Sequence, residues 1–346
     1  MHHSVATVPL ATTAGMLYAR AAAVSIRPGL FRLAALTPVL ALLLVLPFSV
    51  PLYGARGLAA FFLVWLGEFK LLLLAFGRGP LDPALRPLPF AFTAALPVKL
   101  RRQRQAADAA AVTNTVAVVA LPLLSSGIKV AVTASIFQFL FRYKETTHPY
   151  ATSTLYGVIM YCVLDSVLPC LAVAGRALGM EMEPQFNKPY LSASLQDFWG
   201  RRWNLMASAV LRPSVYDPVR RRLGAPAGVL SAFLVSGLMH EVVVYYLTFR
   251  APTGRVTAFF ALHGACACAE RWCARRCSGV KAPPRVVAAP LVLAFVAGTA
   301  FWLFFPAVFG GGMGDLYVAE NVALASSLLD ACRGKVATAG QPGLVS

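Results

Sequence analysis

His240 and Glu241 are the only residues able to carry charge near neutral pH in the apolar stretch from Ala227 to Phe249. A helix of this length crosses a bilayer, which takes about 20 residues. Ionisable groups are costly in hydrocarbon, so they usually serve a function there. Imidazole titrates near neutral pH and can accept and return a proton. We interpret His240 as a candidate general base. The alternative is a histidine that bonds a neighbouring helix as part of the packing.

Two small residues precede this histidine on the same helical face. Ser236 and Gly237 lie four and three positions before His240, where they would leave room for a ligand or allow a Ser236–imidazole hydrogen bond. Glu241 lies about 100° further round the helix and is better placed to anchor a hydrogen bond than to react. His263 lies in another apolar segment and is a rival base, but no small residues approach it in the same way.

A second group of polar and aromatic residues occupies positions 187–204. Ser192 or Ser194 can cap a helix that starts near Leu195 and carries Asp197 in its first turn. This pattern predicts a short helix that begins with an ordinary N-cap.

The same predicted helix carries two tryptophans and two arginines. Trp199 and Trp203 are four apart and would stack on one face, with Asn204 one position further on. Arg201 and Arg202 point elsewhere. By composition alone, this is an interfacial helix with an aromatic belt and snorkelling arginines.

The composition identifies a polytopic membrane protein. Of 346 residues, 58% are hydrophobic and 13% are charged, whereas soluble domains carry about 25% charged residues. Mean hydropathy is +0.67. The net charge of +17 is clustered in segments that can all lie on one membrane face, as cytoplasmic loops do; these are residues 20–32, 99–104, 201–222 and 271–285. There is no soluble basic domain that would bind nucleic acid.

Seven cysteines, an odd number, lie mostly in or beside apolar segments, unlike a secreted disulfide framework. Cys266, Cys268, Cys273 and Cys277 follow no common zinc-binding spacing. We therefore expect no metal site, and interpret this cluster as small apolar or palmitoylated residues at a helix end.

Hydrophobic runs predict an all-α transmembrane bundle with seven or eight spans. The expected apolar segments are residues 33–55, 58–76, 109–141, 149–175, 227–249, 256–272 and 286–314. Glu68 and Lys70 in the second segment are two apart and do not face each other, so we expect structural roles for both. No internal repeat or linker divides the central domain, residues 33–314.

The two ends of the chain differ from this domain. Residues 1–32 are rich in Ala and Thr, contain arginines and lack acids. This composition is typical of an organelle transit peptide or of a weak first span interrupted by Arg20; we favour a membrane-associated segment. Residues 315–346 are expected to form a polar, loosely held tail.

Together these motifs resemble the plant wax synthase family, a branch of the membrane-bound O-acyltransferases. The resemblance extends from about Pro28 to Pro306 and rests on four segments, residues 69–81, 143–149, 197–204 and 236–241. The two central motifs are specific in combination. The N-terminus departs from the family pattern, because an Ala-rich segment with Arg20 stands where relatives have a clear first hydrophobic span.

The resemblance implies a helical bundle around a reaction chamber and an acyl transfer in the endoplasmic reticulum membrane. The donor would be a long-chain acyl-CoA and the acceptor a long-chain alcohol, giving a wax ester. Sterol acylation is the alternative within the class. A non-catalytic lipid transporter or scaffold is the alternative outside it. Acyl-CoA would be a co-substrate, and no cofactor is expected.

The resemblance also assigns roles to residues. His240 would be the base that deprotonates the alcohol, and Asn204 the second functional residue, which either donates to the developing oxyanion or orients the histidine. Four flanking residues would support the site, namely Glu241, Ser236, Asp197 and Trp203. Direct transfer is favoured, because no Ser or Cys lies in a recognisable nucleophile motif. Apart from the resemblance, the basic side chains would hold the CoA phosphates or only set the topology; these are Arg201, Arg202 and the run Arg220–Arg222.

Overall fold

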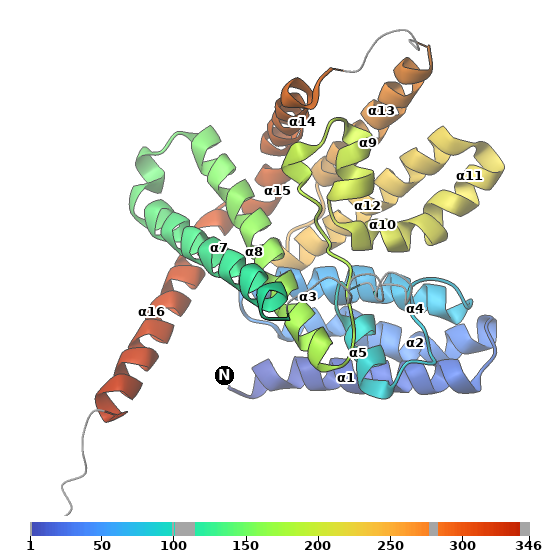
Figure 1. The fold of residues 1–346 in the computed structure, drawn as a ribbon, viewed down its shortest axis with the longest axis horizontal. Helices are drawn as coiled ribbons and strands as arrows, with labels where there is room; N and C mark the ends of the chain where they lie inside the picture. Colours follow the sequence, from blue (N-terminus) through green and yellow to red (C-terminus); the bar gives the residue numbers. More distant parts are fainter. Residues whose placement is uncertain (1, 99, 101–114, 277–282, 340–346) are drawn as a thin grey trace, which may run out of the picture.

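The computed structural model describes residues 2–98, 100, 115–276 and 283–339. This part of the chain is helical apart from turns, loops and one isolated bridge between Leu100 and Met182. Figure 1 shows the helices as a single bundle. The predicted all-α class is confirmed.

The regular helices are α1 (His2–Ser25), α2 (Leu30–Val45), α3 (Tyr53–Ala59), α4 (Glu68–Ala75), α5 (Pro87–Ala95), α7 (Thr115–Tyr143), α8 (Pro149–Ala177), α9 (Leu195–Asp197), α10 (Leu205–Leu211), α11 (Asp217–Leu223), α12 (Ala225–Thr248), α13 (Arg255–Arg276), α14 (Arg285–Thr299), α15 (Phe305–Phe309) and α16 (Met313–Ala339). The tighter 3₁₀ turns are η1 (Leu46–Ser49), η3 (Lys144–Thr146) and η4 (Pro189–Leu191). The wider π-helical segments are η2 (Ala60–Gly67), η5 (Phe198–Arg202), η6 (Arg212–Tyr216) and η7 (Ala300–Phe304).

Six helical segments in the described residues are long and apolar enough to cross a membrane. They are Leu30–Ser49, Tyr53–Ala75, Leu124–Thr146, Pro149–Ala177, Ala225–Thr248 and Arg285–Phe309. The polytopic architecture is therefore as predicted, whereas the predicted count of seven or eight spans is not confirmed. Helix α13 includes the expected segment 256–272 but does not meet the same criterion.

The boundary between the first two of these spans differs from the prediction. The expected segment 33–55 is interrupted at Val50–Leu52, where the backbone is extended, and a new helix starts at Tyr53. Pro51 lies in this break, and Pro47 lies in the turn before it. Proline lacks the N–H that would continue the helical hydrogen bonds. Gly54, Gly57 and Leu58 therefore belong to the same span as Glu68.

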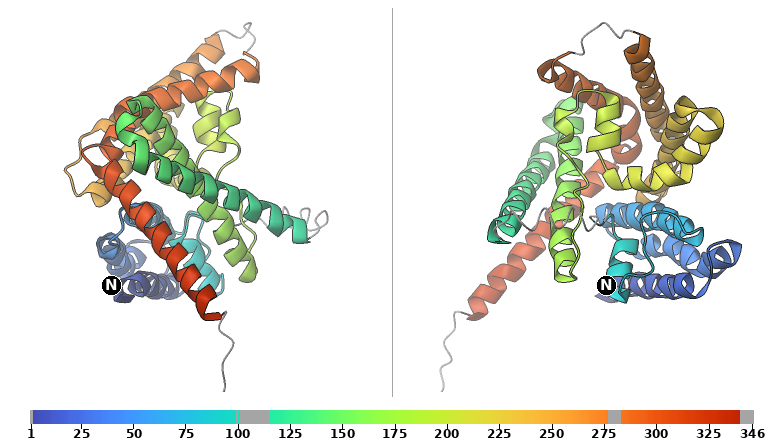
Figure 2. Two further views of the ribbon diagram at one scale, coloured as in Figure 1. Left: turned by 90° about the vertical axis from the view of Figure 1, so that its left-hand side faces the viewer. Right: turned by 45° about the vertical axis from the view of Figure 1, so that its right-hand side comes forward.

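The N-terminal helices pack together at the bottom of Figures 1 and 2. Helix α1 contacts α2 and α5, and its Met16 and Ala19 are fully buried in a cluster with Leu36 and Phe90. Arg20 Nε donates to the carbonyl oxygen of Leu85 at 2.7 Å. From Val8 on, helix α1 is thus packed against the core, although it is not among the six candidate spans.

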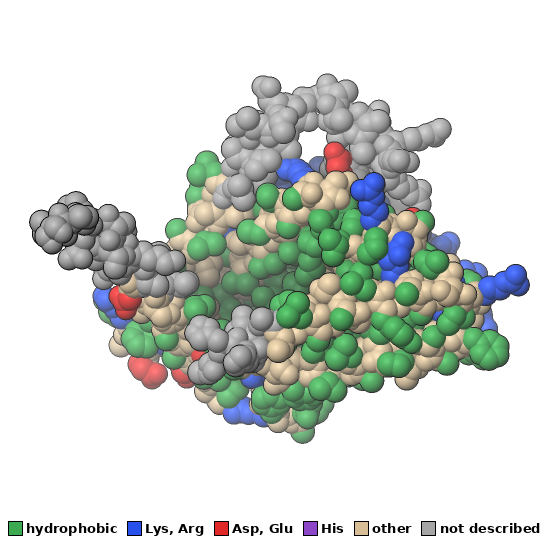
Figure 3. All heavy atoms as spheres, turned by 90° about the horizontal axis from the view of Figure 1, so that it is seen from below, with side chains coloured by type: hydrophobic (Ala, Val, Ile, Leu, Met, Phe, Trp, Pro, Cys, Tyr) green, Lys and Arg blue, Asp and Glu red, His purple; other side chains and the backbone are tan. Residues whose placement is uncertain are grey.

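The other helices form the rest of the bundle. Helices α12 and α13 make the most extensive pair in the described chain, and α7 pairs with α8 and with α16. Figure 2 shows α7 and α16 projecting from the body. Of the expected polar tail, residues 315–339 lie in α16, whose Val318 is buried, and residues 340–346 lie outside the described part of the chain. Viewed from below, the described surface is largely hydrophobic and hollowed near its middle, with Lys and Arg toward its rim (Figure 3).

Buried cations satisfy carbonyl groups where helices end. Arg56 donates to the carbonyl oxygens of Tyr246 (2.7 Å) and Leu247 (2.9 Å) at the end of α12. Lys70, 1% exposed, donates to those of Thr93 (2.7 Å) and Leu96 (2.5 Å) at the end of α5. Helix C-termini carry unpaired carbonyls and partial negative charge. The structural role predicted for Lys70 is confirmed.

Replacing Lys70 with Met should lower the thermal stability of the purified protein. The substitution preserves the apolar stem and removes the ammonium group. The buried Thr93 carbonyl then loses its donor at a cost of about 1–3 kcal/mol, whereas the Leu96 carbonyl still accepts from the backbone N–H of Val98. The measurement is the melting temperature in detergent.

Lys144→Met is the matched control, because Lys144 forms a surface ion pair with Asp315, a contact typically worth about 1 kcal/mol or less. Equal melting temperatures for the two variants would contradict the role assigned to Lys70.

Candidate active site

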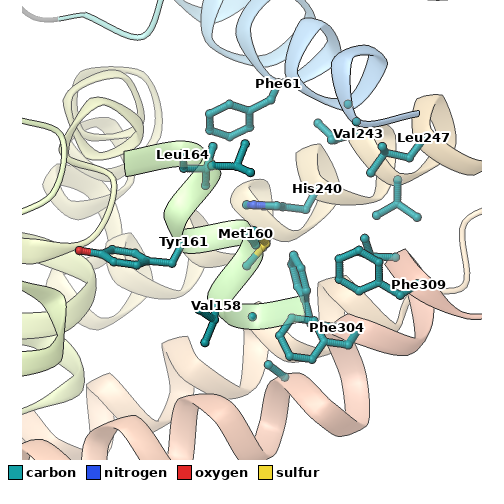
Figure 4. A pocket seen from close by; sticks show the side chains of 18 of the residues that line it. Phe61, Val158, Met160, Tyr161, Leu164, His240, Val243, Leu247, Phe304 and Phe309 are labelled. Carbon is teal, nitrogen blue, oxygen red and sulfur yellow. The ribbon is translucent and has the colours of Figure 1, made fainter. Parts of the chain in front are cut away.

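A cavity of about 780 Å³ lies in the bundle. Helices α3, α8, α12 and α13, the segment from α14 to α16, and the Trp-rich residues after α9 form its walls. Most of the lining side chains are aliphatic or aromatic, as in small-molecule sites of this size. His240 and Asn204 both line it. Figure 4 shows the imidazole extending from α12 into this space, between Leu164 and Met160 of α8.

One hydrogen bond fixes the orientation of the imidazole. Nδ1 of His240 lies 2.7 Å from the backbone carbonyl oxygen of Ser236. A carbonyl oxygen only accepts, so Nδ1 carries the hydrogen and Nε2 of the neutral ring has a free lone pair. The predicted partner residue is therefore confirmed, but the bonding atom is the backbone oxygen and not the hydroxyl. The described residues provide no hydrogen-bond partner for Nε2.

The small residues before His240 serve helix packing. A Cβ at Gly237 would lie 2.8 Å from the Cα of Thr257 in α13, so glycine is needed for the close approach of the two helices. Ser236 is buried, and neither residue lines the cavity. The expectation that they leave room for a ligand is wrong.

Glu241 holds the start of the neighbouring helix. Its carboxylate accepts hydrogen bonds from the backbone N–H groups of Thr253 (3.2 Å), Val256 (2.9 Å) and Thr257 (3.2 Å). These are orphan donors at the N-terminus of α13, where negative charge is favourable. The residue next to the histidine thus fastens α13 to α12, as the predicted anchoring role requires.

Asn204 adopts a backbone conformation that few residues other than glycine tolerate, with φ 44° and ψ 66°. Its Oδ1 accepts from the backbone N–H of Ala207 at 3.1 Å and caps α10. Within the described chain its Nδ2 has no hydrogen-bond partner, and Asn204 makes no hydrogen bond to His240. Asn204 was expected either to donate to the oxyanion or to orient the histidine. Its free N–H groups suit the first role, donation to a ligand in the cavity. The prediction that Asn204 continues the helix of Trp203 is wrong.

The two tryptophans contact each other without stacking in parallel. The rings of Trp199 and Trp203 are 6.5 Å apart and at 75°; Trp203 stacks instead on Phe198, at 5.4 Å and 14°. The two rings meet edge to face and do not form the predicted stack, because η5 has a wider turn than an α-helix and ends at Arg202, one residue before Trp203. Both tryptophans still line the cavity.

Asp197 fastens the segment that carries these tryptophans. The backbone N–H of Asp197 donates to Ser194 Oγ at 3.0 Å, which confirms the predicted cap. Its Oδ2 lies 2.7 Å from Arg202 Nε and 3.2 Å from the backbone nitrogen of Ala193. Burial raises the pKa of the Asp197 carboxyl, but these hydrogen bonds outweigh it and hold the pKa below its usual value of 3.8.

The two arginines have different surroundings. Arg202 also donates from Nη1 to the carbonyl oxygens of Asn187 (3.1 Å) and Lys188 (3.3 Å), so its guanidinium is engaged within the fold. Arg201 is exposed. Neither lines the cavity.

His263, the rival base, is enclosed and fully bonded. It is 0% exposed. Its Nδ1 accepts from Trp199 Nε1 at 3.0 Å, and its Nε2 lies 2.8 Å from Thr299 Oγ1. Neither ring nitrogen is free, and His263 does not line the cavity. This histidine ties the tryptophan-bearing segment to α13 and α14.

Three π-helical segments place aromatic rings around the cavity, a feature that the sequence did not predict. Phe61 comes from η2, Trp199 from η5 and Phe304 from η7, and all three line it. π-helical turns are rare and occur frequently at functional sites. The hydrophobic pattern of these segments reads as ordinary α-helix, so their sequence gives no sign of the wider turn.

Comparison with known proteins agrees with this geometry. Residues 182–262 match the family described as "Membrane bound O-acyl transferase family". The chain is 40% identical to the long-chain-alcohol O-fatty-acyltransferase of Simmondsia chinensis over 82% of this chain and 83% of that protein. It is 38% identical to "Probable long-chain-alcohol O-fatty-acyltransferase 3" of Arabidopsis thaliana over 83% and 84%.

This chain belongs to the plant wax synthase family. It is an integral membrane O-acyltransferase. The family also has similarity to sterol-acylating enzymes, since the chain is 35% identical to acyl-CoA–sterol O-acyltransferase 1 of Arabidopsis thaliana over 80% of this chain and 82% of that protein. The alternative of a non-catalytic transporter is therefore not supported.

Among the described residues, no three His, Cys, Asp or Glu side chains gather as a metal site requires; Cys277 lies outside them.

The Asp197–Arg202 pair predicts a pH-dependent contribution to the stability of this wax synthase. A carboxyl whose pKa is lower in the folded state stabilises the protein above its unfolded pKa of about 3.8, and this contribution is lost as the pH falls through the folded value. Asp197→Asn should therefore melt at a lower temperature than the unaltered protein at pH 7, with the difference shrinking below about pH 4.

The measurement is the melting temperature of both proteins in detergent from pH 7 to pH 3. A difference that stays constant over this range would show that the carboxylate charge is not what stabilises the segment.

Proposed function

We propose that this protein transfers the acyl group of a long-chain acyl-CoA to the hydroxyl of a long-chain fatty alcohol and releases a wax ester and free CoA. The observation that carries the proposal is one imidazole with a free nitrogen in an apolar cavity, His240. The activity named for the relatives supports the choice of donor and acceptor. The cavity suits alkyl chains, because its walls are mostly aliphatic and aromatic.

His240 is proposed to act as general base. Nε2 accepts the proton of the alcohol as the alcohol oxygen forms a bond to the thioester carbon. The carbon–sulfur bond of the tetrahedral intermediate then breaks, and the imidazolium returns the proton to the CoA sulfur. The Ser236 carbonyl accepts from Nδ1–H throughout and stabilises the positive charge of the ring between the two steps.

Asn204 is proposed to stabilise the oxyanion. Its Oδ1 is occupied by the cap of α10, which turns the two N–H donors of Nδ2 toward other partners. A donor placed on a developing oxyanion contributes about 3 kcal/mol in other enzymes. The acyl group would pass directly from CoA to alcohol without an acyl-enzyme, a cofactor or a metal.

The endoplasmic reticulum membrane, where long-chain acyl-CoA and lipid alcohols meet, is the proposed location.

Sterol acylation is the second candidate, because one relative bears that name. The chemistry at His240 would be the same, and only the acceptor would differ. In the deciding experiment, the protein is expressed in yeast that lacks its own neutral-lipid acyltransferases. Microsomes from these cells are supplied with labelled acyl-CoA, fatty alcohols and sterols, and the esters formed are identified. Formation of wax esters supports the first candidate, and sterol esters alone would replace it with the second.

Replacing His240 with Ala should abolish ester synthesis in membranes that contain the protein at unaltered levels. Loss of a general base costs about 10²–10⁴-fold in rate. The assay is the formation of labelled ester from acyl-CoA in microsomes, normalised to the amount of protein.

His263→Asn is the matched control, since that histidine does not line the cavity. It should lower stability and retain a larger share of the activity per folded molecule. Ester synthesis that survives in His240→Ala would refute the proposed mechanism.

A test of phosphate binding uses the exposed arginine. Arg201→Ala should raise the KM for acyl-CoA severalfold and leave kcat and the KM for the alcohol unchanged, because Arg201 has no bond within the described fold to lose. Arg255→Ala, at an exposed site at the start of α13 and outside the basic clusters, is the control. An unaltered KM in Arg201→Ala, with normal insertion, would leave topology as the role of this charge.

A further inference from the structure

The imidazole of His240 contacts four aromatic rings besides the Ser236 carbonyl, and those of Phe260 and Trp65 lie closest to it. Beyond the Ser236 carbonyl, the ring of Phe260 stacks on the imidazole with centroids 4.3 Å apart and planes at 24°. The indole of Trp65 meets it edge-to-face, at 4.5 Å and 71°. Rotation about the side-chain bonds of His240 would bring the imidazole into one of these rings, so Nε2 keeps one direction.

Trp65 contacts the histidine from outside the cavity. It is 1% exposed and does not line the cavity. Its surroundings are apolar side chains of a buried cluster that includes Leu66, Leu73 and Met206. A substrate in the cavity would therefore meet His240 but not the indole behind it.

Packing alone does not explain why position 65 is a tryptophan. Its Nε1–H is buried and has no hydrogen-bond partner in the described chain, although a buried tryptophan normally finds one. An unpaired buried donor is unfavourable, and phenylalanine would fill much of the same space without it. The contact that a large ring makes with the imidazole gives a reason for tryptophan at this position.

The backbone of each neighbour is built to place these rings. Trp65 lies in η2, a π-helical interruption of the span Tyr53–Ala75, and such a turn shifts the side chains that follow it round the helix axis. Phe260 lies in α13. This helix packs close to α12 because Gly237 has no side chain there, and the Glu241 carboxylate binds its first N–H groups.

We infer that Trp65 is a positioning residue for the acyl transfer, which with Phe260 keeps Nε2 of His240 directed into the cavity. The inference rests on the proposed role of His240 as base. Trp65 touches neither substrate, so its removal should slow the chemical step without weakening substrate binding. Small displacements of a catalytic group can lower a rate about 10²-fold.

The experiment compares Trp65→Leu and Trp65→Phe with a matched control, Leu73→Ala. Leu73 is 6% exposed and belongs to the same buried cluster, eight residues after Trp65 in the same span. In microsomes, Trp65→Leu should lower kcat about 10–100-fold and leave both KM values within about twofold. Trp65→Phe should recover most of kcat, and Leu73→Ala should keep the kcat of the unaltered protein per folded molecule.

Trp65→Met is the additional variant if Trp65→Leu does not accumulate, and it should fall below Trp65→Phe in kcat by about fivefold or more. A kcat in Trp65→Leu equal to that of Leu73→Ala would overturn the inference, as would a rise in KM with kcat unchanged. His240→Ala is run in the same membranes. If it is active, the proposed role of His240 as base fails; if it is inactive while Trp65→Leu keeps full kcat, only the positioning role of Trp65 fails.

Discussion

The hydrogen bond between His240 Nδ1 and the Ser236 carbonyl is the interaction on which the site depends. It decides which ring nitrogen carries the hydrogen and which is left for a substrate. Because the acceptor is a backbone atom one helical turn away, the tautomer is set by α12 itself and needs no partner from another helix. Everything else in the site keeps this ring facing a space that alkyl chains can occupy.

Several helix ends of the bundle are satisfied by charged side chains within the protein. In a bilayer, unpaired backbone groups have no water to bind. Glu241 pairs the first N–H groups of α13, Arg56 the last carbonyls of α12, and Lys70 those of α5. Short, broken helices can therefore lie at membrane depth around the cavity, and the charged residues that allow this are buried in protein and not exposed to lipid.

The sequence alone predicted the helical class, the catalytic histidine candidate and a serine cap at position 192 or 194, because each depends on local pattern or on the cost of charge in hydrocarbon. The structure selects Ser194 as the cap. It located most apolar segments, although the break near Pro51 was missed. The errors concern residues whose role depends on another helix. Gly237 was assigned to a ligand space but faces α13, and Asn204 was placed in a continuing helix but starts a new one. The contact between Trp65 and the imidazole depends on a π-helical turn that no hydrophobic period reveals.

Asn204 combines two demands that few side chains meet together. The backbone there is left-handed, which favours glycine or asparagine, while the helix that follows needs a side-chain oxygen as its cap. Glycine would satisfy the first demand only, and aspartate would satisfy both but present an acceptor where asparagine presents donors. The range of amino acids open to this position during divergence of the enzyme is therefore very narrow, even before any catalytic requirement is imposed.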